Sequence, residues 1–366
     1  MTSQYEFVRR MTQLYDTLQD DLSRTLFWDR LKFDINPCLE NAINLYVDSA
    51  GFNEEQKKKQ YKIRKQLHDL HAQGKKVLLY GAGVCGRGIA ELFQMDGIPF
   101  EGFCDTNAHK LPNSILGKKV YPPEYLFKNA NACYVLISTI DYYSEIKEYL
   151  LRHNISQDHI LPFFAPQVSG AARKQYFEFM DFFRRGTAFV DGGCFNAADS
   201  YYFAQCCEGA YSKIFAFEPD KANAQHCVEN AEKWGLKNFN LIQAGLSNVS
   251  DTVLFATGNG EGSHIIDPQK DEMRLFDYTD HSIPYETIKL STVDETVQDI
   301  KVGFVKLDIE GAELDALHGA QRMLIRDKPL LAICLYHKAG DMLAIMDYLH
   351  SLVPEYRFWI RHYSTL

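Results

Sequence analysis

The sequence predicts an α/β fold in which a helical segment precedes two doubly wound parallel-sheet units. Three observations predict this fold. At 366 residues the chain is long for a single domain. Its first 74 residues repeat their apolar positions at the spacing of helices. After residue 74, short apolar runs alternate with helical patterns, and this alternation begins again near residue 174.

The helical segment is expected over residues 1–74. Its first apolar stripe, at three- and four-residue steps, consists of Phe7, Met11, Leu14, Leu18 and Leu22. A second helix is predicted from residue 54 onward, with Gly74 placed to end it. We interpret the basic run from Lys57 to Lys65 as a solvated helix face, with a docking patch for an anionic ligand as the alternative.

The first parallel-sheet unit is expected over residues 75–164. Its predicted strands are KKVLLY (75–80), PFEGFCD (99–105) and ACYVLIST (132–139). Helices are predicted at 87–97 and 142–154, between and after these strands. The segment 162–170 contains two prolines and ends in glycine, which indicates a linker to the next unit.

The second parallel-sheet unit is expected over residues 174–366. Its predicted strands are TAFVDGG (187–193), KIFAFEP (213–219), FNLIQAG (239–245), TVLFAT (252–257), GFVKLDI (303–309), PLLAICLYH (329–337) and, last, YRFWIRHY (356–363). A helix is predicted at 340–353. About 190 residues suit one doubly wound domain.

Composition excludes several classes of protein. The net charge of −9 argues against a general nucleic-acid binder. Nine scattered cysteines without a CxxC pair indicate neither a disulfide framework nor a zinc site, which favours a cytoplasmic protein with reduced thiols. No apolar run approaches the length of a membrane span, so none is expected. The oligomeric state is left open.

A glycine-rich turn in the first unit indicates a possible nucleotide site. Gly81, Gly83 and Gly86 form GxGxxG between a predicted strand and a predicted helix, the context in which this motif binds a pyrophosphate. Asp105 ends the next strand, where an acid can accept ribose hydroxyls. A nucleotide or nucleotide sugar is therefore a candidate ligand. The alternative is that the glycines only form the turn.

A second strand-to-glycine turn lacks dinucleotide spacing and begins with an acid. Asp191 ends its strand and is followed by Gly192 and Gly193. A negative charge there would repel a pyrophosphate, but it suits the ammonium and sulfonium of S-adenosylmethionine (SAM). Glu218 ends the next strand, where a carboxylate can accept both ribose hydroxyls. The two acids at adjacent strand ends favour a SAM site over two helix caps.

A third polar cluster lies in VKLDIEGAEL (305–314). Lys306, Asp308 and Glu310 alternate along the predicted strand, and burying them in an apolar core would be costly. At the carboxyl end of the strand they would instead line the crevice in which open α/β sheets bind ligands. We interpret them as catalytic candidates, with an acid cluster that caps the next helix as the alternative.

Four segments, taken in order, resemble the FkbM-type SAM-dependent methyltransferases. They are FVDGGCFNAADS (189–200), IFAFEPD (214–220), LSTVDE (290–295) and FVKLDIEGAELDALHGAQRML (304–324). The resemblance covers about residues 189–335, and KxDxEGAE is its most specific element. The N-terminal half is similar to the Rossmann-like accessory region of certain bacterial members.

This resemblance implies a class I methyltransferase fold, SAM as cofactor, and methyl transfer to a hydroxyl of a sugar, glycan or natural product. The cofactor residues that it implies are Asp191, Gly192, Gly193, Phe195, Asn196, Glu218, Pro219, Gln243 and Ala244. The sequence departs from the family at Ala197, where glycine is usual, at Asn248 and at Cys334. A further strand of the sheet is expected to be missing after YRFWIRHYSTL.

For the base that accepts the acceptor's proton, we rank Asp308 first and His337 second, with Glu310 and Lys306 beside them. His264 is a further candidate. No metal is expected, although Asp308 and Glu310 are possible oxygen ligands for one. Two other functions stay open, a nicotinamide-dependent oxidoreductase and a non-catalytic nucleotide-sugar sensor, both of which would use the Gly81–Gly86 turn.

Overall fold

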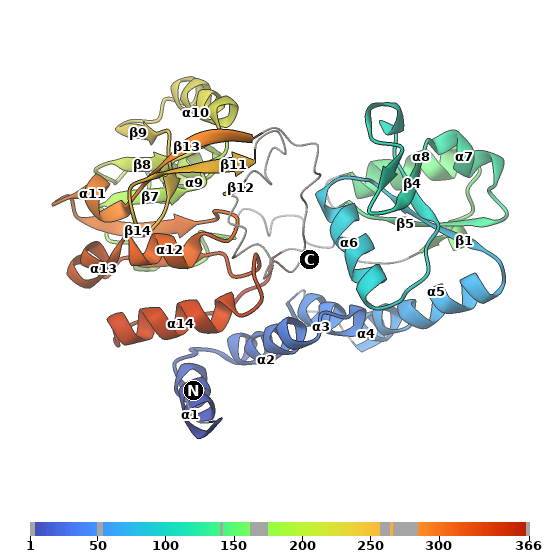
Figure 1. Cartoon of the computed structure of the whole chain (residues 1–366), viewed down its shortest axis with the longest axis horizontal. Helices are drawn as coiled ribbons and strands as arrows, with labels where there is room; N and C mark the ends of the chain where they lie inside the picture. Colours follow the sequence, from blue (N-terminus) through green and yellow to red (C-terminus); the bar gives the residue numbers. More distant parts are fainter. Residues whose placement is uncertain are drawn as a thin grey trace. The chain divides into compact units, whose positions relative to one another are not determined.

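The computed structural model of the chain describes residues 4–49, 54–139, 142–161, 175–256, 264–265 and 285–363. These residues form two compact units (Figure 1). The N-terminal unit comprises Gln19–Ser169 together with Trp359–Leu366, and the C-terminal unit comprises Gly170–Phe358 together with Met1–Leu18. The predicted linker at 162–170 lies outside the described residues.

The N-terminal unit begins with helices and continues as alternating strands and helices, as predicted. Its elements are α2 (Asp21–Ile35), α3 (Leu39–Ser49), α4 (Glu54–Tyr61), α5 (Ile63–Ala72), β1 (Lys76–Tyr80), α6 (Val84–Met95), β2 (Gly102–Cys104), η1 (Ala108–Lys110), β3 (Ser114–Ile115), β4 (Lys118–Tyr121), α7 (Pro123–Lys128), β5 (Cys133–Ile137), α8 (Tyr143–Arg152), η2 (Gln157–His159) and β6 (Ile160–Leu161). Gly74 follows α5 with φ +71°, the left-handed conformation expected where glycine ends a helix.

The sheet of this unit has the order β3-β4-β2-β1-β5-β6. All neighbouring strands are parallel except β3, which pairs antiparallel with β4. β1 is thus central, with β2 on one side and β5 on the other. The chain leaves β1 through the glycine turn, so this turn lies where the strand order reverses, at the ligand-binding edge of such sheets.

The C-terminal unit contains a second α/β layer structure. Its elements are α1 (Gln4–Asp16), η3 (Met180–Phe182), β7 (Ala188–Gly192), α9 (Ala198–Cys206), β8 (Ile214–Phe217), α10 (Lys221–Lys233), β9 (Phe239–Ile242), β10 (Gly245–Leu246), β11 (Thr252–Ala256), β12 (His264–Ile265), β13 (Tyr285–Ser291), α11 (Val293–Val297), β14 (Val302–Leu307), α12 (Glu313–His318), α13 (Gln321–Asp327), β15 (Leu330–Ile333) and α14 (Asp341–Leu352). Its main sheet has the order β15-β14-β7-β8-β9 and is parallel throughout.

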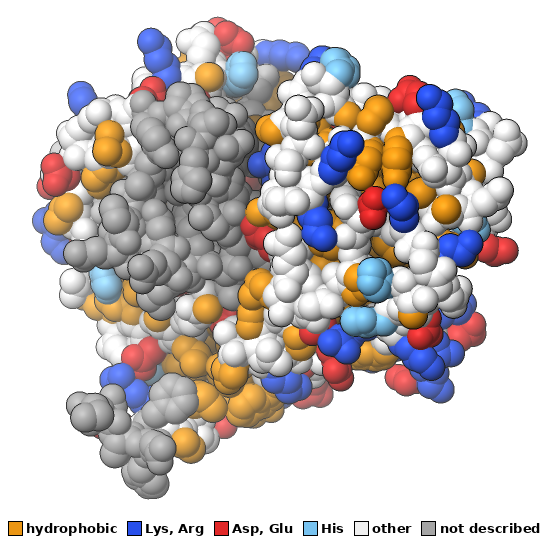
Figure 2. Space-filling model, turned by 45° about the vertical axis from the view of Figure 1, so that its right-hand side comes forward, with side chains coloured by type: hydrophobic (Ala, Val, Ile, Leu, Met, Phe, Trp, Pro, Cys, Tyr) orange, Lys and Arg blue, Asp and Glu red, His pale blue; other side chains and the backbone are white. Residues whose placement is uncertain are grey.

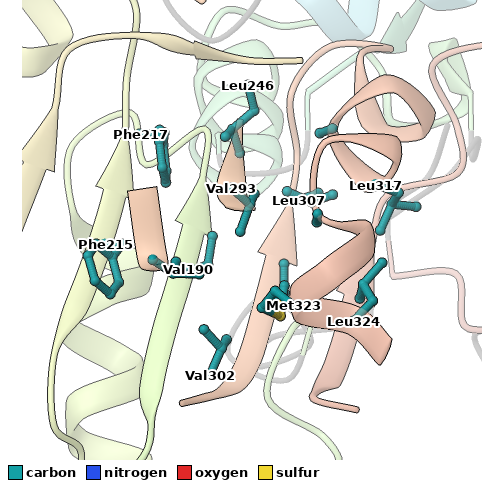
Figure 3. Close-up of a cluster of buried hydrophobic side chains, with 14 of the residues drawn as sticks. Val190, Phe215, Phe217, Leu246, Val293, Val302, Leu307, Leu317, Met323 and Leu324 are labelled. Atoms are coloured by element: carbon teal, nitrogen blue, oxygen red, sulfur yellow. The ribbon is translucent and has the colours of Figure 1, made fainter. Parts of the chain in front are cut away.

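Side chains on the two faces of this sheet pack into separate apolar layers. Figure 3 shows one layer, in which Val190 of β7 and Leu307 of β14 meet Leu317 of α12 and Leu324 of α13. The opposite layer contains the stacked rings of Phe189, Phe203 and Phe304. Because successive strand residues point to opposite faces, both layers follow directly from the apolar runs in the sequence.

One predicted strand of this unit forms in a separate sheet, and another does not form. The segment 252–257 contributes β11, but β11 pairs antiparallel with β13 in a separate four-stranded sheet of order β10-β13-β11-β12. The predicted last strand, 356–363, forms only an isolated bridge from Phe358 to Leu18. Apolar alternation could not reveal either outcome, because it does not specify a strand's partner.

The predicted helical segment is divided between the two units because α1 and α2 contact different segments of the C-terminal part of the chain. Helix α1 packs on α14, and Arg10 forms an ion pair with Asp347. Asp20 begins α2 by accepting a hydrogen bond from the Ser23 N–H, and it also binds Arg361. The hydrogen bond from Arg361 lowers the pKa of Asp20 to about 2. Residues 359–363 therefore associate with α2.

The surface of the described residues carries charges of both signs. Figure 2 shows Lys and Arg side chains beside Asp and Glu side chains. Within the basic run, Lys57 pairs with Asp48, Lys59 with Glu55, and Arg64 with Asp96. Several of its cations therefore have acidic neighbours. None of the helices in the described part of the chain is both long and apolar enough to cross a membrane.

Candidate cofactor and active site

The candidate site lies at the carboxyl edge of the β14-β7-β8 strands. After β7 the chain continues to β8 on one side, and only later does it add β14 on the other. In open α/β sheets this reversal leaves a crevice at the carboxyl ends of the strands. The predicted acids all fall in this region: Asp191 on β7, Glu218 just after β8, and Asp308 just after β14.

A buried ammonium lies at the centre of this edge. Lys306 is 1% exposed and stands beside Asp191 in the register of β14 and β7. Its Nζ donates to the Gly193 carbonyl oxygen at 2.7 Å and lies 3.3 Å from Asp191 Oδ1 and 3.2 Å from Asp199 Oδ2. Although burial opposes the charged form, the two carboxylates raise the pKa of Lys306. We expected Lys306 to be a catalytic residue that faces the ligand, but its ammonium is enclosed by the protein.

Asp191 is fully buried, whereas we expected it to face the cofactor. Its Oδ2 accepts a hydrogen bond from the Ser200 hydroxyl at 2.7 Å, and its Oδ1 lies beside Lys306. Asp199, in the first turn of α9, has a side chain that is 30% exposed. Of the two carboxylates beside Lys306, only that of Asp199 is therefore partly exposed, and Asp199 was not among the predicted site residues.

The turn after β7 is held in an unusual backbone conformation. Gly193 has φ +74°, and a Cβ there would lie 2.0 Å from the Asp308 carbonyl oxygen, so only glycine fits. Phe195 and Ala197 also have positive φ, of 50° and 63°. Ala197 replaces the glycine usual in the family, and its left-handed conformation agrees with the strain we expected there.

Glu218 closes this turn from the end of β8. Its Oε2 accepts from the Phe195 N–H at 2.9 Å, and its Oε1 accepts from the Asp220 N–H at 3.0 Å. Burial raises the pKa of Glu218 to about 7, against the opposing effect of these two hydrogen bonds. The side chain is thus fixed in orientation by a hydrogen bond to each of its carboxylate oxygens.

The other predicted cofactor residues lie around the same turn. Asn196 Oδ1 accepts from the Ala198 N–H at the start of α9, and its carbonyl oxygen accepts from Asn230. Gln243 is exposed directly after β9, and Ala244 is buried beside it. Gly192 ends β7, and a Cβ at Gly192 would collide with Leu307 and Leu246. These predicted cofactor residues, which lie between β7 and β9 in the sequence, are therefore found at one edge of the main sheet.

Four ionisable side chains meet beyond β14 and β15. His337 Nδ1 lies 2.9 Å from Glu313 Oε1, and its Nε2 lies 3.5 Å from Asp308 Oδ1 and 3.6 Å from Glu310 Oε2. Burial would lower the pKa of His337, but the charge of Glu313 and the contact with Glu310 raise it to about 10. Although burial disfavours its charged form, Lys306 and His337 lower the pKa of Asp308.

Two tyrosines that sequence reasoning missed hold Asp308. Tyr176 donates to Asp308 Oδ2 at 2.6 Å, and its ring lies 5.2 Å from the Lys306 ammonium. Tyr336 donates to Asp308 Oδ1 at 3.1 Å. Tyr336 directly precedes the predicted site residue His337, and this position could have identified it as a further site residue. Tyr176 is 132 residues from Asp308 and belongs to no motif, so the sequence offered no signal for it. The side chain of His264 lies outside the described residues.

In the N-terminal unit, the glycine turn binds its own acid. Asp105 Oδ2 accepts from the Ala82 N–H at 2.9 Å, and its Oδ1 accepts from the Asn107 N–H at 2.7 Å. A Cβ at Gly86 would lie 2.0 Å from the Gly81 carbonyl oxygen, whereas Gly83 has open space around it. The described contacts give Asp105 a structural role, and a nucleotide site here stays a prediction.

The buried ammonium generates a prediction about stability. The variant Lys306→Met should lower the free energy of unfolding by about 3–5 kcal/mol, because it leaves the charge of Asp191 buried without its partner. Urea unfolding of the purified protein measures this loss. The double variant Lys306→Met with Asp191→Asn also removes the unpaired buried charge, so it should recover part of the lost free energy of unfolding. A loss below about 1 kcal/mol in the single variant would contradict a structural role for the ammonium.

Comparison with known proteins identifies family matches and a shared fold. Residues 191–360 match the family described as Methyltransferase FkbM domain, and residues 73–161 match the family described as C2185-like, N-terminal. The crystal structure of a methyltransferase FkbM from Methylobacillus flagellatus KT matches 94% of this chain and 96% of its own, with 14% identity and a TM-score of 0.50. This similarity shows a shared fold.

Two other solved structures are less similar. An rRNA methylase from Streptococcus thermophilus matches 46% of this chain and 72% of its own, with 15% identity and a TM-score of 0.28. SMU.1697c from Streptococcus mutans, a putative methyltransferase in complex with SAH, matches 51% and 84%, with 12% identity and a TM-score of 0.29. Scores this low support no inference about the fold. Among curated proteins, no match was found.

The family match covers the strands and turns that build the crevice. It begins at Asp191 and extends beyond His337, so it includes the turn after β7, Glu218 and the KxDxEGAE segment. It also confirms the family that these motifs indicated. Residues 191–360 therefore form a domain of the FkbM methyltransferase family.

Proposed function

We propose that this protein is a SAM-dependent methyltransferase that transfers a methyl group to a hydroxyl of a sugar, glycan or natural product. The observation that carries the proposal is Glu218, fixed at the end of β8 by two backbone N–H groups of the neighbouring turns. A carboxylate in this place can accept hydrogen bonds from both ribose hydroxyls of the cofactor.

In this proposal the cofactor's ammonium binds Asp199, and Asp191 has a structural role in the turn after β7. Asp191 is enclosed by Ser200 and Lys306, so it holds the turn in shape without touching the ligand. Asp199 is partly exposed at the start of α9 and forms an ion pair with the same Lys306 ammonium. Asp199 Oδ2 lies beside the Lys306 ammonium, so we propose that Asp199 Oδ1 binds the ammonium of the cofactor.

The acceptor is proposed to bind at the Asp308 side of the crevice. The Asp308 side chain is 22% exposed, and Tyr336 is 44% exposed beside it. The reaction is an in-line attack of the acceptor oxygen on the sulfonium methyl, so orientation and exclusion of water supply much of the rate. Asp308 and His337 remain our candidates for orienting the hydroxyl and taking its proton.

The N-terminal glycine turn and the location of the protein also belong to the proposal. All nine cysteines are free thiols, which supports a reducing compartment such as the cytoplasm. A nucleotide or nucleotide sugar at the Gly81 turn would have to compete with Asp105 for the Ala82 N–H. We therefore expect any such ligand to bind mainly at the N-terminal end of α6, where the helix dipole favours an anion.

Two substitutions should separate the proposed ribose and ammonium contacts. Glu218→Gln should weaken both SAM and 5′-methylthioadenosine by at least roughly tenfold, because charged hydrogen bonds contribute ~1.5–3 kcal/mol each. Asp199→Asn should weaken SAM alone, because 5′-methylthioadenosine has the ribose but lacks the ammonium. Isothermal titration calorimetry measures the four affinities.

Glu229→Gln is the matched control, because Glu229 lies on the exposed side of α10 in the same unit. It should bind both ligands as the native protein does. Unchanged SAM affinity in Glu218→Gln would refute the cofactor assignment. Equal weakening of both ligands by Asp199→Asn would refute only the ammonium contact.

The raised pKa of Glu218 predicts that cofactor affinity depends on pH. Only the ionised carboxylate accepts two hydroxyl hydrogen bonds, and its pKa in the folded protein is about 7. Affinity should therefore be constant above this pKa and fall below it, by roughly tenfold per pH unit. Titration with 5′-methylthioadenosine between about pH 6 and pH 8 avoids the ionisation of the SAM amino group. Native affinity that is flat in this range, as expected for Glu218→Gln, would contradict the prediction.

The acceptor class can be tested by following the methyl group. Incubation with SAM carrying a labelled methyl and a panel of sugars, glycans and hydroxylated natural products should yield a labelled methyl ether on oxygen. Mass spectrometry with fragmentation locates the label. A label found only on nitrogen, carbon or RNA would contradict the proposed acceptor, while leaving methyl transfer itself intact.

A further inference from the structure

The side chains of Asp308, Glu310, Glu313 and His337 form a compact group, here called the acid–histidine cluster. One ligand-type atom from each of Asp308, Glu313 and His337 lies within 4.8 Å of the other two. The three come from different places: the end of β14, the first residue of α12, and the segment after β15. The fold of the sheet therefore brings them together at the proposed acceptor side.

Three deeply buried atoms of this cluster lack hydrogen-bond partners among the described residues. Glu313 is 0% exposed, and its Oε2 makes no hydrogen bond. The His337 side chain is 6% exposed, and neither ring nitrogen makes a hydrogen bond of acceptable geometry, although carboxylate oxygens lie nearby. Buried polar atoms are almost always satisfied, so three such atoms in one cluster indicate a missing partner.

We propose that Asp308, Glu313 and His337 bind a divalent transition-metal ion, of which Mn²⁺ and Zn²⁺ fit the donors best. One imidazole nitrogen with two carboxylate oxygens is a mixed set; imidazole favours Zn²⁺ over Mg²⁺ or Ca²⁺, and carboxylates also suit Mn²⁺. Adjacent ligands at bonds of about 2.1 Å stand about 3.0–3.4 Å apart, in octahedral or tetrahedral geometry. The three ligand atoms lie within 4.8 Å of one another, so the cluster has to close around the ion when it binds.

Charge around the cluster also favours a cation. Asp191 and Asp199 lie beside the Lys306 ammonium, while Glu310 and Glu313 face His337. A buried carboxylate needs compensating charge; the buried Asp191 has it in Lys306, whereas the buried Glu313 has His337 beside it. A proton on His337 is one way to supply this charge, and a divalent ion bound to neutral His337 is the other. The ion also satisfies the orphaned Glu313 oxygen, which the proton does not.

The ion would act on the acceptor in the proposed reaction. An acceptor hydroxyl bound to a divalent ion loses its proton more readily, and the ion also fixes its orientation. This role rests on the proposed function, but binding of the ion does not. Tyr336, which donates to Asp308, would orient that ligand as outer partners commonly do in metal sites.

The test measures metal binding by the full chain without SAM. After dialysis against a chelator and then into chelator-free buffer, titration with Mn²⁺ alone, followed by electron paramagnetic resonance of the free ion, should show one ion bound per chain. Competition should show that Zn²⁺ binds more tightly. Glu313→Gln and His337→Gln should each weaken Mn²⁺ by at least roughly tenfold. Glu313→Gln keeps an acceptor for the Ile309 N–H, so it should preserve the local fold.

Glu229→Gln is again the matched control and should bind Mn²⁺ as the native protein does. Circular dichroism of each variant verifies that it is folded. The proposal is overturned if the native protein binds neither Mn²⁺ nor Zn²⁺ below about 1 mM. It is also overturned if the folded Glu313→Gln and His337→Gln variants both retain native affinity. SAM calorimetry on the same preparations separates this failure from failure of the proposed function.

Discussion

The buried ammonium of Lys306 is the interaction on which the rest of the site depends. It connects the end of β14 to the acid of β7, to the first turn of α9, and to the carbonyl of Gly193 in the turn. A lysine without solvent is costly unless its charge is matched. Here it is matched by acids from two different elements, so these elements have to meet at one place.

The same constraint divides the carboxylates into two groups. Asp191 is fully enclosed and serves the fold, because its partners are the Ser200 hydroxyl and the ammonium. Glu218 and Asp308 are also fixed by hydrogen bonds, yet they stand at the crevice. Glu218 is nearly as buried as Asp191, at 5% exposure, so what separates the two acids is their partners: Asp191 is paired with an ammonium, whereas Glu218 accepts hydrogen bonds from backbone N–H groups.

Much of the fold and part of the site could be predicted from the sequence. The strand-turn-helix order, the two glycine turns and the acids at strand ends follow from local patterns, and KxDxEGAE identified the family. Local patterns could not show that Lys306 pairs with Asp191, because that contact depends on the register of two strands far apart in sequence. For the same reason they missed Tyr176 and could not show that 252–257 pairs in a separate sheet.

The central claim is that the turn held by Lys306 presents Glu218 and Asp199 to SAM. A crystal structure of the native protein with S-adenosylhomocysteine tests it most directly. We predict that both ribose hydroxyls donate to Glu218, that the amino group contacts Asp199, and that Lys306 stays bonded to the Gly193 carbonyl. A ligand bound elsewhere, or one whose ribose does not contact Glu218, would contradict the claim.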